Sequence, residues 1–98
     1  MKYQTVESVI TNVAHVMNFE RTELTGPSRY RNRVRIRHVA MWLARKVTYA
    51  SFPEIGRAFH RDHTSCLVAI RKVDALVKSH DPMTCRCVEV CLERLGAA

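Results

Sequence analysis

Residues 62–65, Asp-His-Thr-Ser, place four hydrogen-bonding side chains in succession at the expected start of a helix. Ser51 and Glu54 have the spacing of a capping box, which predicts a helix over 52–59, and a second N-cap follows at Asp62. Two capped helices joined by a tight turn are typical of a helix-turn-helix, whose second helix places its first turn in the DNA major groove. The pattern therefore favours a site that reads DNA.

The side chains of this first turn suit different base edges. An aspartate oxygen can accept a hydrogen bond from the cytosine amino group, a histidine can donate or accept at a purine edge, and a threonine methyl can pack on thymine. The alternative for Asp62 is that its carboxylate only caps the helix, a role worth about 1 kcal/mol. The sequence leaves both interpretations of Asp62 open.

Positive charge is concentrated in the middle of the chain. Between Ser28 and Lys72 there are eleven Lys or Arg residues against only Glu54 and Asp62, a balance of +9, whereas the remaining residues sum to −2. Such a cluster favours a polyanion, because neutralising phosphates releases condensed counterions. A membrane surface would also attract it, but the arginines gather in a loop and around a turn rather than along an amphipathic helix. We expect a nucleic-acid partner and no membrane attachment.

Arginines alternate with other residues over 28–38, SRYRNRVRIRH. This period of two predicts an extended segment up to a helix that begins near Arg35. We interpret the segment as an arm along DNA, in which an arginine can enter a narrow minor groove. The alternative is a solvated basic loop.

Helical periodicity along the chain predicts an all-α fold, a single compact helical domain of about five or six helices with a helix-turn-helix. The length of 98 residues suits one domain, 1–98, with a modest core that includes Trp42. The expected helices cover about 4–17, a short turn within 18–24 that the loop residues 25–28 end, and then 35–47, 52–59 and 62–79. A last helix is expected to start at Asp81-Pro82.

Four cysteines, three of them close together, raise the question of a metal. We expect reduced thiols that fill helix faces, as in an intracellular protein. The alternative is a zinc site made by His80, Cys85, Cys87 and Cys91, but the CxCx3C spacing lacks the paired CxxC of familiar zinc sites. We expect no metal and no cofactor, and we expect Cys66 to be structural.

No segment approaches the roughly 18 uninterrupted apolar residues of a membrane span, and the first residues contain no apolar block of a signal peptide. We therefore expect a cytoplasmic, nucleoid-associated protein. The sequence has no GxxxxGK[ST] phosphate loop and no evident catalytic constellation, so we expect neither nucleotide binding nor an enzyme.

The segment 39–73, VAMWLARKVTYASFPEIGRAFHRDHTSCLVAIRKV, resembles the C-terminal DNA-binding domain of the bacterial replication initiator DnaA through AMWLAR, PEIGRAF and RDHTS. With weaker similarity at both ends, the resemblance covers roughly 5–95. It implies a stand-alone domain without the initiator's ATPase module. It also implies binding to double-stranded DNA at a site like the initiator's box, which would regulate replication initiation or transcription.

The resemblance also implies roles for individual residues. The base-reading residues would be Arg29 in the minor groove, with Arg31 and Arg33 as alternatives for that position, and Pro53, Asp62, His63 and Thr64 in the major groove. The phosphate-binding residues would be Arg31, Arg33, Arg37, Arg45, Lys46, Ser51, Arg61 and Ser65. His38 occupies a position where the family often has a polar side chain near the DNA backbone.

Two positions depart from the family pattern. The family usually has a glycine-containing turn before RDHT, whereas His60 stands alone here, which shortens the turn by one residue. Histidine is among the non-glycine residues that accept a left-handed backbone, so His60 can cap the helix at some energetic cost. Val68 replaces a common histidine, which removes a polar contact and fits either altered sequence preference or a surface that meets protein.

Two alternative functions follow from these observations. The chain could regulate the replication initiator by contacting the initiator or its inactivating partners. It could also bind nucleic acid, including RNA, without sequence preference through the arginine segment.

Overall fold

Six helices make up the computed structural model, which describes residues 4–27 and 29–96. No strand occurs within these two ranges, so the predicted all-α fold with its helix-turn-helix is confirmed. The helices are α1 (Val6–Met17), α2 (Arg21–Thr25), α3 (Arg31–Val47), α4 (Phe52–Ala58), α5 (His63–Lys78) and α6 (Pro82–Arg94). Ser28, part of the predicted loop, lies outside the described residues, as do both ends of the predicted domain 1–98.

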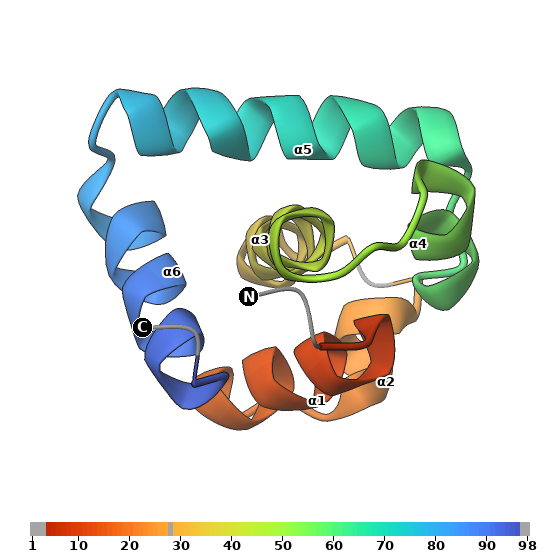
Figure 1. Ribbon diagram of the computed structural model, residues 1–98, viewed down its shortest axis with the longest axis horizontal. Coiled ribbons are helices and arrows are strands. Elements are labelled where there is room, and N and C mark those ends of the chain that lie inside the picture. The colour runs from red at the N-terminus through yellow and green to blue at the C-terminus, as the bar shows by residue number, and fades with distance from the viewer. Residues whose placement is uncertain (1–3, 28, 97–98) are drawn as a thin grey trace.

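Helix α3 occupies the centre of the fold. Figure 1 views α3 along its axis, with α5 across the top, α6 on one side, α4 on the other and α1 and α2 below. Every residue from Val39 to Ala44 is buried, so this part of α3 is enclosed on all sides, as expected for a helix that is apolar all round. Its neighbours are thereby held in place by a common core.

The surrounding helices contribute apolar stripes to the same core. Trp42 is 8% exposed and its Nε1 lies 3.4 Å from Asp74 Oδ1 on α5, which confirms the prediction that Trp42 is a core residue. The other buried apolar side chains outside α3 include Val9, Ile10, Val13, Leu24, Ile55, Phe59, Cys66, Ile70, Val73, Cys87, Val88, Cys91 and Leu95. Burial raises the pKa of the Cys66 thiol, consistent with a packing role.

Local capping explains where several helices start. Asp81 Oδ2 accepts the Thr84 amide at 3.0 Å and Pro82 follows at the first helical position, so α6 begins where the sequence predicted. Thr5 and Ser8 cap α1 reciprocally, at 3.1 Å in both directions.

The prediction of an extended segment up to Arg35 is wrong, because α3 begins at Arg31. On a helix, residues two apart differ by about 200° in direction and residues four apart share a face. The alternating arginines therefore fall on two opposite faces of α3 instead of lining one arm.

No helix among the described residues is long and apolar enough to cross a membrane. Within residues 4–27 and 29–96, no group of His, Cys, Asp or Glu side chains is arranged to hold a metal ion.

Candidate nucleic-acid interface

The first turn of α5 presents four exposed polar residues, Asp62, His63, Thr64 and Ser65. Asp62 occupies the N-cap position, but its carboxylate accepts no amide of that turn. Instead Asp62 Oδ1 lies 3.5 Å from His63 Nδ1, and the two side chains are 66% and 60% exposed. The interpretation of Asp62 as a helix cap only therefore lacks its hydrogen bond, and the carboxylate faces solvent.

The turn that precedes α5 is tightly closed. The Arg61 amide donates to the Gly56 oxygen at 2.8 Å, which folds the chain back onto α4. A Cβ at position 56 would lie 2.6 Å from the Arg61 oxygen, so only glycine permits this approach.

His60 adopts the left-handed backbone that histidine accepts, with φ 56°. Its amide donates to the Arg57 oxygen at 3.2 Å, which ends α4. The expectation for His60 is confirmed, and the turn closes without a glycine at this position.

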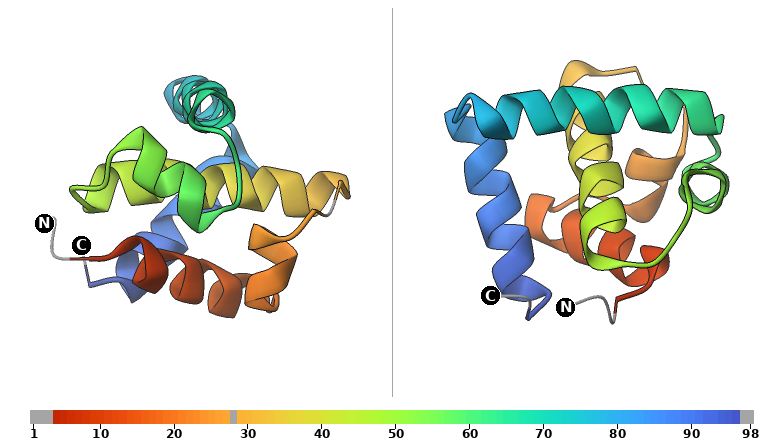
Figure 2. Two further views of the ribbon diagram at one scale, coloured as in Figure 1. Left: turned by 90° about the vertical axis from the view of Figure 1, so that its right-hand side faces the viewer. Right: turned by 45° about the horizontal axis from the view of Figure 1, so that its top comes forward.

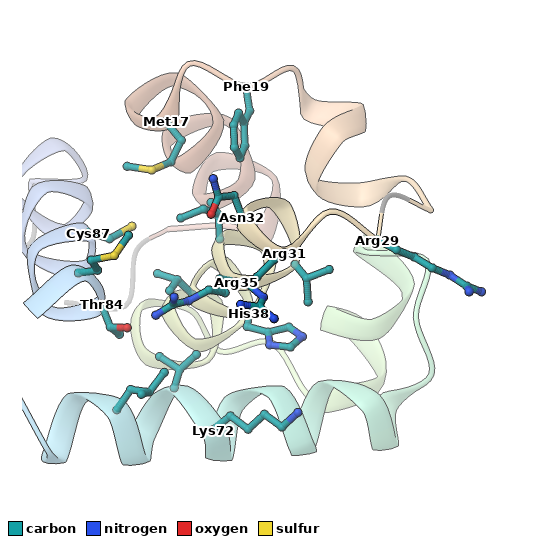
Figure 3. Close-up of a pocket in the computed structure, with 16 residues that line it drawn as sticks. Met17, Phe19, Arg29, Arg31, Asn32, Arg35, His38, Lys72, Thr84 and Cys87 are labelled. Carbon is teal, nitrogen blue, oxygen red and sulfur yellow. The ribbon is translucent and has the colours of Figure 1, made fainter. Parts of the chain in front are cut away.

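Arg29 and Pro53, the other two residues predicted to read bases, are both exposed. Arg29 lies in the segment before α3, and Figure 3 shows its side chain pointing away from the arginines of α3. Pro53 is exposed in the first turn of α4. The left view of Figure 2 shows α4 and the turn that leads into α5 towards the front, and the segment before α3 at the right edge. The bond from Arg61 to the Gly26 oxygen joins the turn before α5 to the residues that lead into this segment.

The first four arginines of α3 fall on two sides of the helix. Arg31 and Arg35 lie beside a pocket of about 580 Å³ between α3, α5 and the ends of α1 and α6, and Arg35 is 3.7 Å from Asp81 Oδ2. Arg33 faces α2, where its Nη2 is 2.8 Å from Glu23 Oε2 and its guanidinium lies 5.0 Å from the ring centroid of Tyr30. Among the predicted phosphate ligands in the first two turns of this helix, Arg31 alone is both exposed and outside an ion pair within the described residues.

The position of Arg37 in the structure does not fit the phosphate contact predicted for it. Only 5% of it is exposed, and its Nε donates to the Leu24 oxygen at 2.8 Å. Burial, and then the neighbouring charge of Arg61, lower the pKa of Arg37. In this structure Arg37 holds the end of α2 instead of facing a ligand.

Arg61 also directs its guanidinium inward. Its Nη2 donates to the Gly26 oxygen at 2.7 Å and its Nη1 to the Phe59 oxygen at 2.9 Å. Sequence reasoning missed these internal roles of Arg37 and Arg61, because their acceptors are backbone oxygens, which no residue type reveals.

The remaining predicted phosphate ligands lie at different distances from the first turn of α5, residues 62–65. Arg45 is exposed, stacks 4.4 Å from the Phe52 ring centroid and donates to the Ala50 oxygen at 3.0 Å, so it lies beside the start of α4. Lys46 lies 5.3 Å from the Trp42 ring and near Asp74. At 1.5 Å per residue, Asp74 is about 16 Å along α5 from the start of that helix at His63. The structure does not bring Lys46 close to the turn.

Ser51 and Ser65 differ in whether the side chain already has a hydrogen-bonding role within the protein. The Ser51 hydroxyl accepts the Glu54 amide at 3.3 Å and lies 3.0 Å from Glu54 Oε1, so the cap already uses it. Ser65 is exposed in the first turn of α5.

His38 is partly buried beside the pocket. Burial lowers the pKa of His38, and the charges of Lys72, Arg37 and Arg61 lower it further, which favours the neutral imidazole.

Comparison with known proteins agrees with this geometry. A family described as "Bacterial dnaA protein helix-turn-helix" matches residues 6–73. The chain is 48% identical over 73 residues to the chromosomal replication initiator protein DnaA of Bradyrhizobium sp. (strain BTAi1), covering 74% of this chain and 15% of that protein. Its identity to the DnaA of Rhodopseudomonas palustris (strain TIE-1) is 47% over 73 residues, covering 74% of this chain and 16% of that protein. With the DnaA of Cereibacter sphaeroides (strain ATCC 17029) it is 42% over 74 residues, covering 74% and 16%.

The chain thus spans about 15% of the length of these curated initiators. The matched part of the chain includes α1 to α4 and the first two thirds of α5, which is the part that contains the helix-turn-helix. The chain belongs to the bacterial DnaA helix-turn-helix family.

Proposed function

We propose that this chain binds double-stranded DNA at a specific site like the initiator's box, and thereby regulates replication initiation or transcription. The observation that carries the proposal is the first turn of α5, where Asp62 to Ser65 are all exposed and the Asp62 carboxylate makes no cap. Donors and acceptors left open at a helix start are what a recognition helix offers to base edges.

In this proposal two grooves are read together. Asp62, His63 and Thr64 contact bases in the major groove, with Pro53 beside them, and Arg29 enters the adjacent minor groove. Arginine is favoured there because a narrow A·T-rich groove has an enhanced negative potential. On this basis the protein acts in the cytoplasm at the nucleoid, without catalysing a reaction and without binding a nucleotide.

Contacts to phosphates would hold the protein in register without reading sequence. Arg31, Arg45 and Ser65 are exposed near the proposed face and are the best candidates. The internal bonds of Arg37 and Arg61 and the ion pair of Arg33 argue against including these three. Each phosphate contact contributes about 0.9 to the slope of log affinity against log salt, so Arg45→Ala should flatten the slope by about 1 for every duplex.

Repeated selection from a pool of random duplexes tests the proposal directly. We expect one motif to be enriched, and the enriched duplex to compete far better than random duplex at fixed salt. Competition at fixed salt is needed because specific and nonspecific binding both depend on phosphates. Binding without enrichment would instead indicate a nonspecific nucleic-acid binder, and a comparison of duplex DNA with RNA of equal length would identify its ligand.

A second candidate is regulation of the initiator through protein contacts, and the pocket beside α3 favours it. The pocket has about 580 Å³, and its apolar lining includes Phe19, Ile36 and Met83, of which Met83 is 68% exposed. Figure 3 shows Arg31, Arg35 and Lys72 around it. An exposed apolar surface with a charged rim is typical of protein interfaces.

The two candidates predict different effects of one substitution. Met83→Ser should leave duplex binding unchanged if DNA is the working ligand, and should abolish binding to the initiator if protein contact is. Val90→Ser is the matched control, because Val90 is exposed on the same helix and does not line the pocket.

A further inference from the structure

The carbonyl oxygen of Gly26 is shared by two arginines from different parts of the fold. Arg61 Nη2 donates to this oxygen at 2.7 Å, and Arg37 Nη2 at 3.2 Å. Arg37 Nε also donates to the Leu24 oxygen at 2.8 Å. One backbone group after α2 is therefore joined both to α3 and to the turn before α5.

The bond from Arg61 joins residues that are farther apart in the sequence than the bonds from Arg37 do. Arg61 Nη1 donates to the Phe59 oxygen at 2.9 Å within the turn, while its Nη2 crosses to Gly26, 35 residues away in sequence. A planar guanidinium that makes two such bonds fixes direction as well as distance. Arg61 thus connects the turn before α5 to Gly26, where the segment that leads to Arg29 begins.

The position of Gly26 is also fixed from the other side. Its amide donates to the Thr22 oxygen at 2.8 Å, and a Cβ on it would lie 2.5 Å from that oxygen. Gly26 therefore sits against α2 while its carbonyl is held by the two arginines.

This attachment matters because of the reach of the segment beyond it. Arg29 follows Gly26 by three residues, and an extended chain covers at most about 3.6 Å per residue, so the Arg29 Cα lies within about 11 Å of Gly26. Successive base pairs are only about 3.4 Å apart along DNA. Arg29 is also joined to Arg31 at the start of α3, two residues on and at most about 7 Å away. Release of Gly26 would therefore let Arg29 shift by up to about two base-pair steps.

We infer that Arg61, supported by Arg37, is a positioning residue that sets the register between Arg29 and the first turn of α5, so that the two grooves are read at one spacing. The inference rests on the proposed function for the two reading groups. It gives Arg61 a role different from the phosphate contact that the family resemblance implied.

A spacing series tests the register. The probes are the duplex selected by the wild-type protein and two versions with one base pair added or removed between its A·T-rich part and the remainder. We expect the wild-type protein to lose about tenfold or more in affinity with each shift, as for a mismatched site. Arg61→Gln should bind the best duplex more weakly and should discriminate less than about threefold among the three, since the arm can then follow the shifted groove.

Arg57→Gln is the matched control for the loss of charge. Arg57 is exposed on α4, close to the same turn, and donates no hydrogen bond to Thr25 or Gly26 in the described part of the chain. This variant should keep the wild-type discrimination between spacings.

The salt dependence separates positioning from phosphate contact. Arg61→Gln should keep the wild-type salt slope, whereas loss of a phosphate contact would reduce it by about 1. Wild-type discrimination between spacings in Arg61→Gln, with or without a reduced slope, would overturn the inference.

A measurement without DNA keeps this test apart from the test of function. Exchange of the Gly26 amide with solvent, followed by NMR in the free protein, should be several-fold faster in Arg61→Gln and unchanged in Arg57→Gln. Unchanged exchange in Arg61→Gln would refute the attachment even if DNA binding is specific. If the wild-type protein selects no duplex, the proposed function fails, and the exchange rates still decide whether Arg61 holds Gly26.

Arg61→Lys serves if Arg61→Gln does not fold. It keeps the positive charge but replaces the planar fork with a single ammonium, which cannot reproduce both bonds. The same loss of spacing discrimination and the same faster exchange are expected.

Discussion

Helices α4 and α5 form one helix-turn-helix, yet the backbone groups at their starts are satisfied differently. At α4, the Ser51 hydroxyl accepts the Glu54 amide at 3.3 Å and the Glu54 carboxylate accepts the Ser51 amide at 3.2 Å. At α5, the Asp62 carboxylate occupies the equivalent position and caps nothing. The helix that supports the motif closes its own end, whereas the helix that would read DNA leaves its first turn open.

This difference suggests a division between stability and binding. The first amides of a helix have no partner within the helix and need a side chain, water or a ligand. A helix start without a side-chain cap is slightly less stable in the free protein, and it keeps its polar groups for a ligand. The predictions below test whether the two helix starts really divide these tasks.

The largest effect is expected from Gly56→Ala, which would break the packing between the two helices. The new Cβ would lie 2.6 Å from the Arg61 oxygen, a backbone atom that cannot move alone. Overpacking costs up to about 3 kcal/mol and alanine regains about 1 kcal/mol over glycine in a helix, so we expect a net loss of about 2 kcal/mol. Thermal unfolding followed by circular dichroism measures this. An unchanged melting temperature would mean that the turn tolerates a wider approach.

Next in size are His63→Ala and Thr64→Ala, which test the open start of α5. Each should cost about 1 to 3 kcal/mol of binding on the best duplex and blur the preference at one or two base pairs, because a base contact is lost. Both side chains are exposed, so stability should change by no more than about 0.5 kcal/mol. Unchanged preference in both variants, measured by competition with single-base mismatches, would contradict direct reading by this turn.

A direct comparison of Ser51→Ala with Asp62→Ala tests whether the two helix starts differ in their contribution to stability. Loss of the Ser51 cap should reduce the free energy of unfolding by about 1 kcal/mol and leave the preferred DNA motif unchanged. Asp62→Ala removes no cap bond and should change stability much less, while it alters the motif. Equal losses of stability in urea unfolding would show that both helix starts depend on their side chains alike.

The smallest effect concerns pH at the start of α4. Hydrogen bonds from the Ser51 amide and hydroxyl lower the pKa of Glu54 below its ordinary value of 4.5. A lowered pKa in the folded state means that Glu54 adds stability above about pH 4.5, and that this stability is lost as pH falls through the lowered pKa. Glu54→Gln should therefore be less stable than wild type at pH 7, and the two should converge in acid. A constant difference between pH 7 and pH 3 would contradict this.

Local signals allowed most of the fold to be predicted from the sequence. The Ser51 and Glu54 capping box and the Asp81-Pro82 start are made by residues a few positions apart, so spacing alone reveals them. The position of α3 was predicted less well. The alternating arginines imitate the period of a strand, but arginine is also a good helix former, and the ion pair of Arg33 with Glu23 and the burial of Arg37 hold this segment as helix.

The candidate site could be predicted only in part for a related reason. Exposure of Asp62 to Ser65 follows from their place at a helix start. The inward bonds of Arg37 and Arg61 depend on the carbonyls of Leu24 and Gly26, which are distant in sequence and carry no side-chain signal. A basic residue near a binding turn therefore cannot be assigned to phosphate from sequence alone.

The single tryptophan, Trp42, offers a built-in optical probe. Its indole ring is buried in α3, its Nε1 faces Asp74, and the proposed DNA face lies at the other end of α5. Its fluorescence should be blue-shifted in the folded protein and shift to the red on unfolding, while DNA at the recognition turn leaves it nearly unchanged. Folding of every variant named above can thus be followed in the presence of DNA, separately from binding.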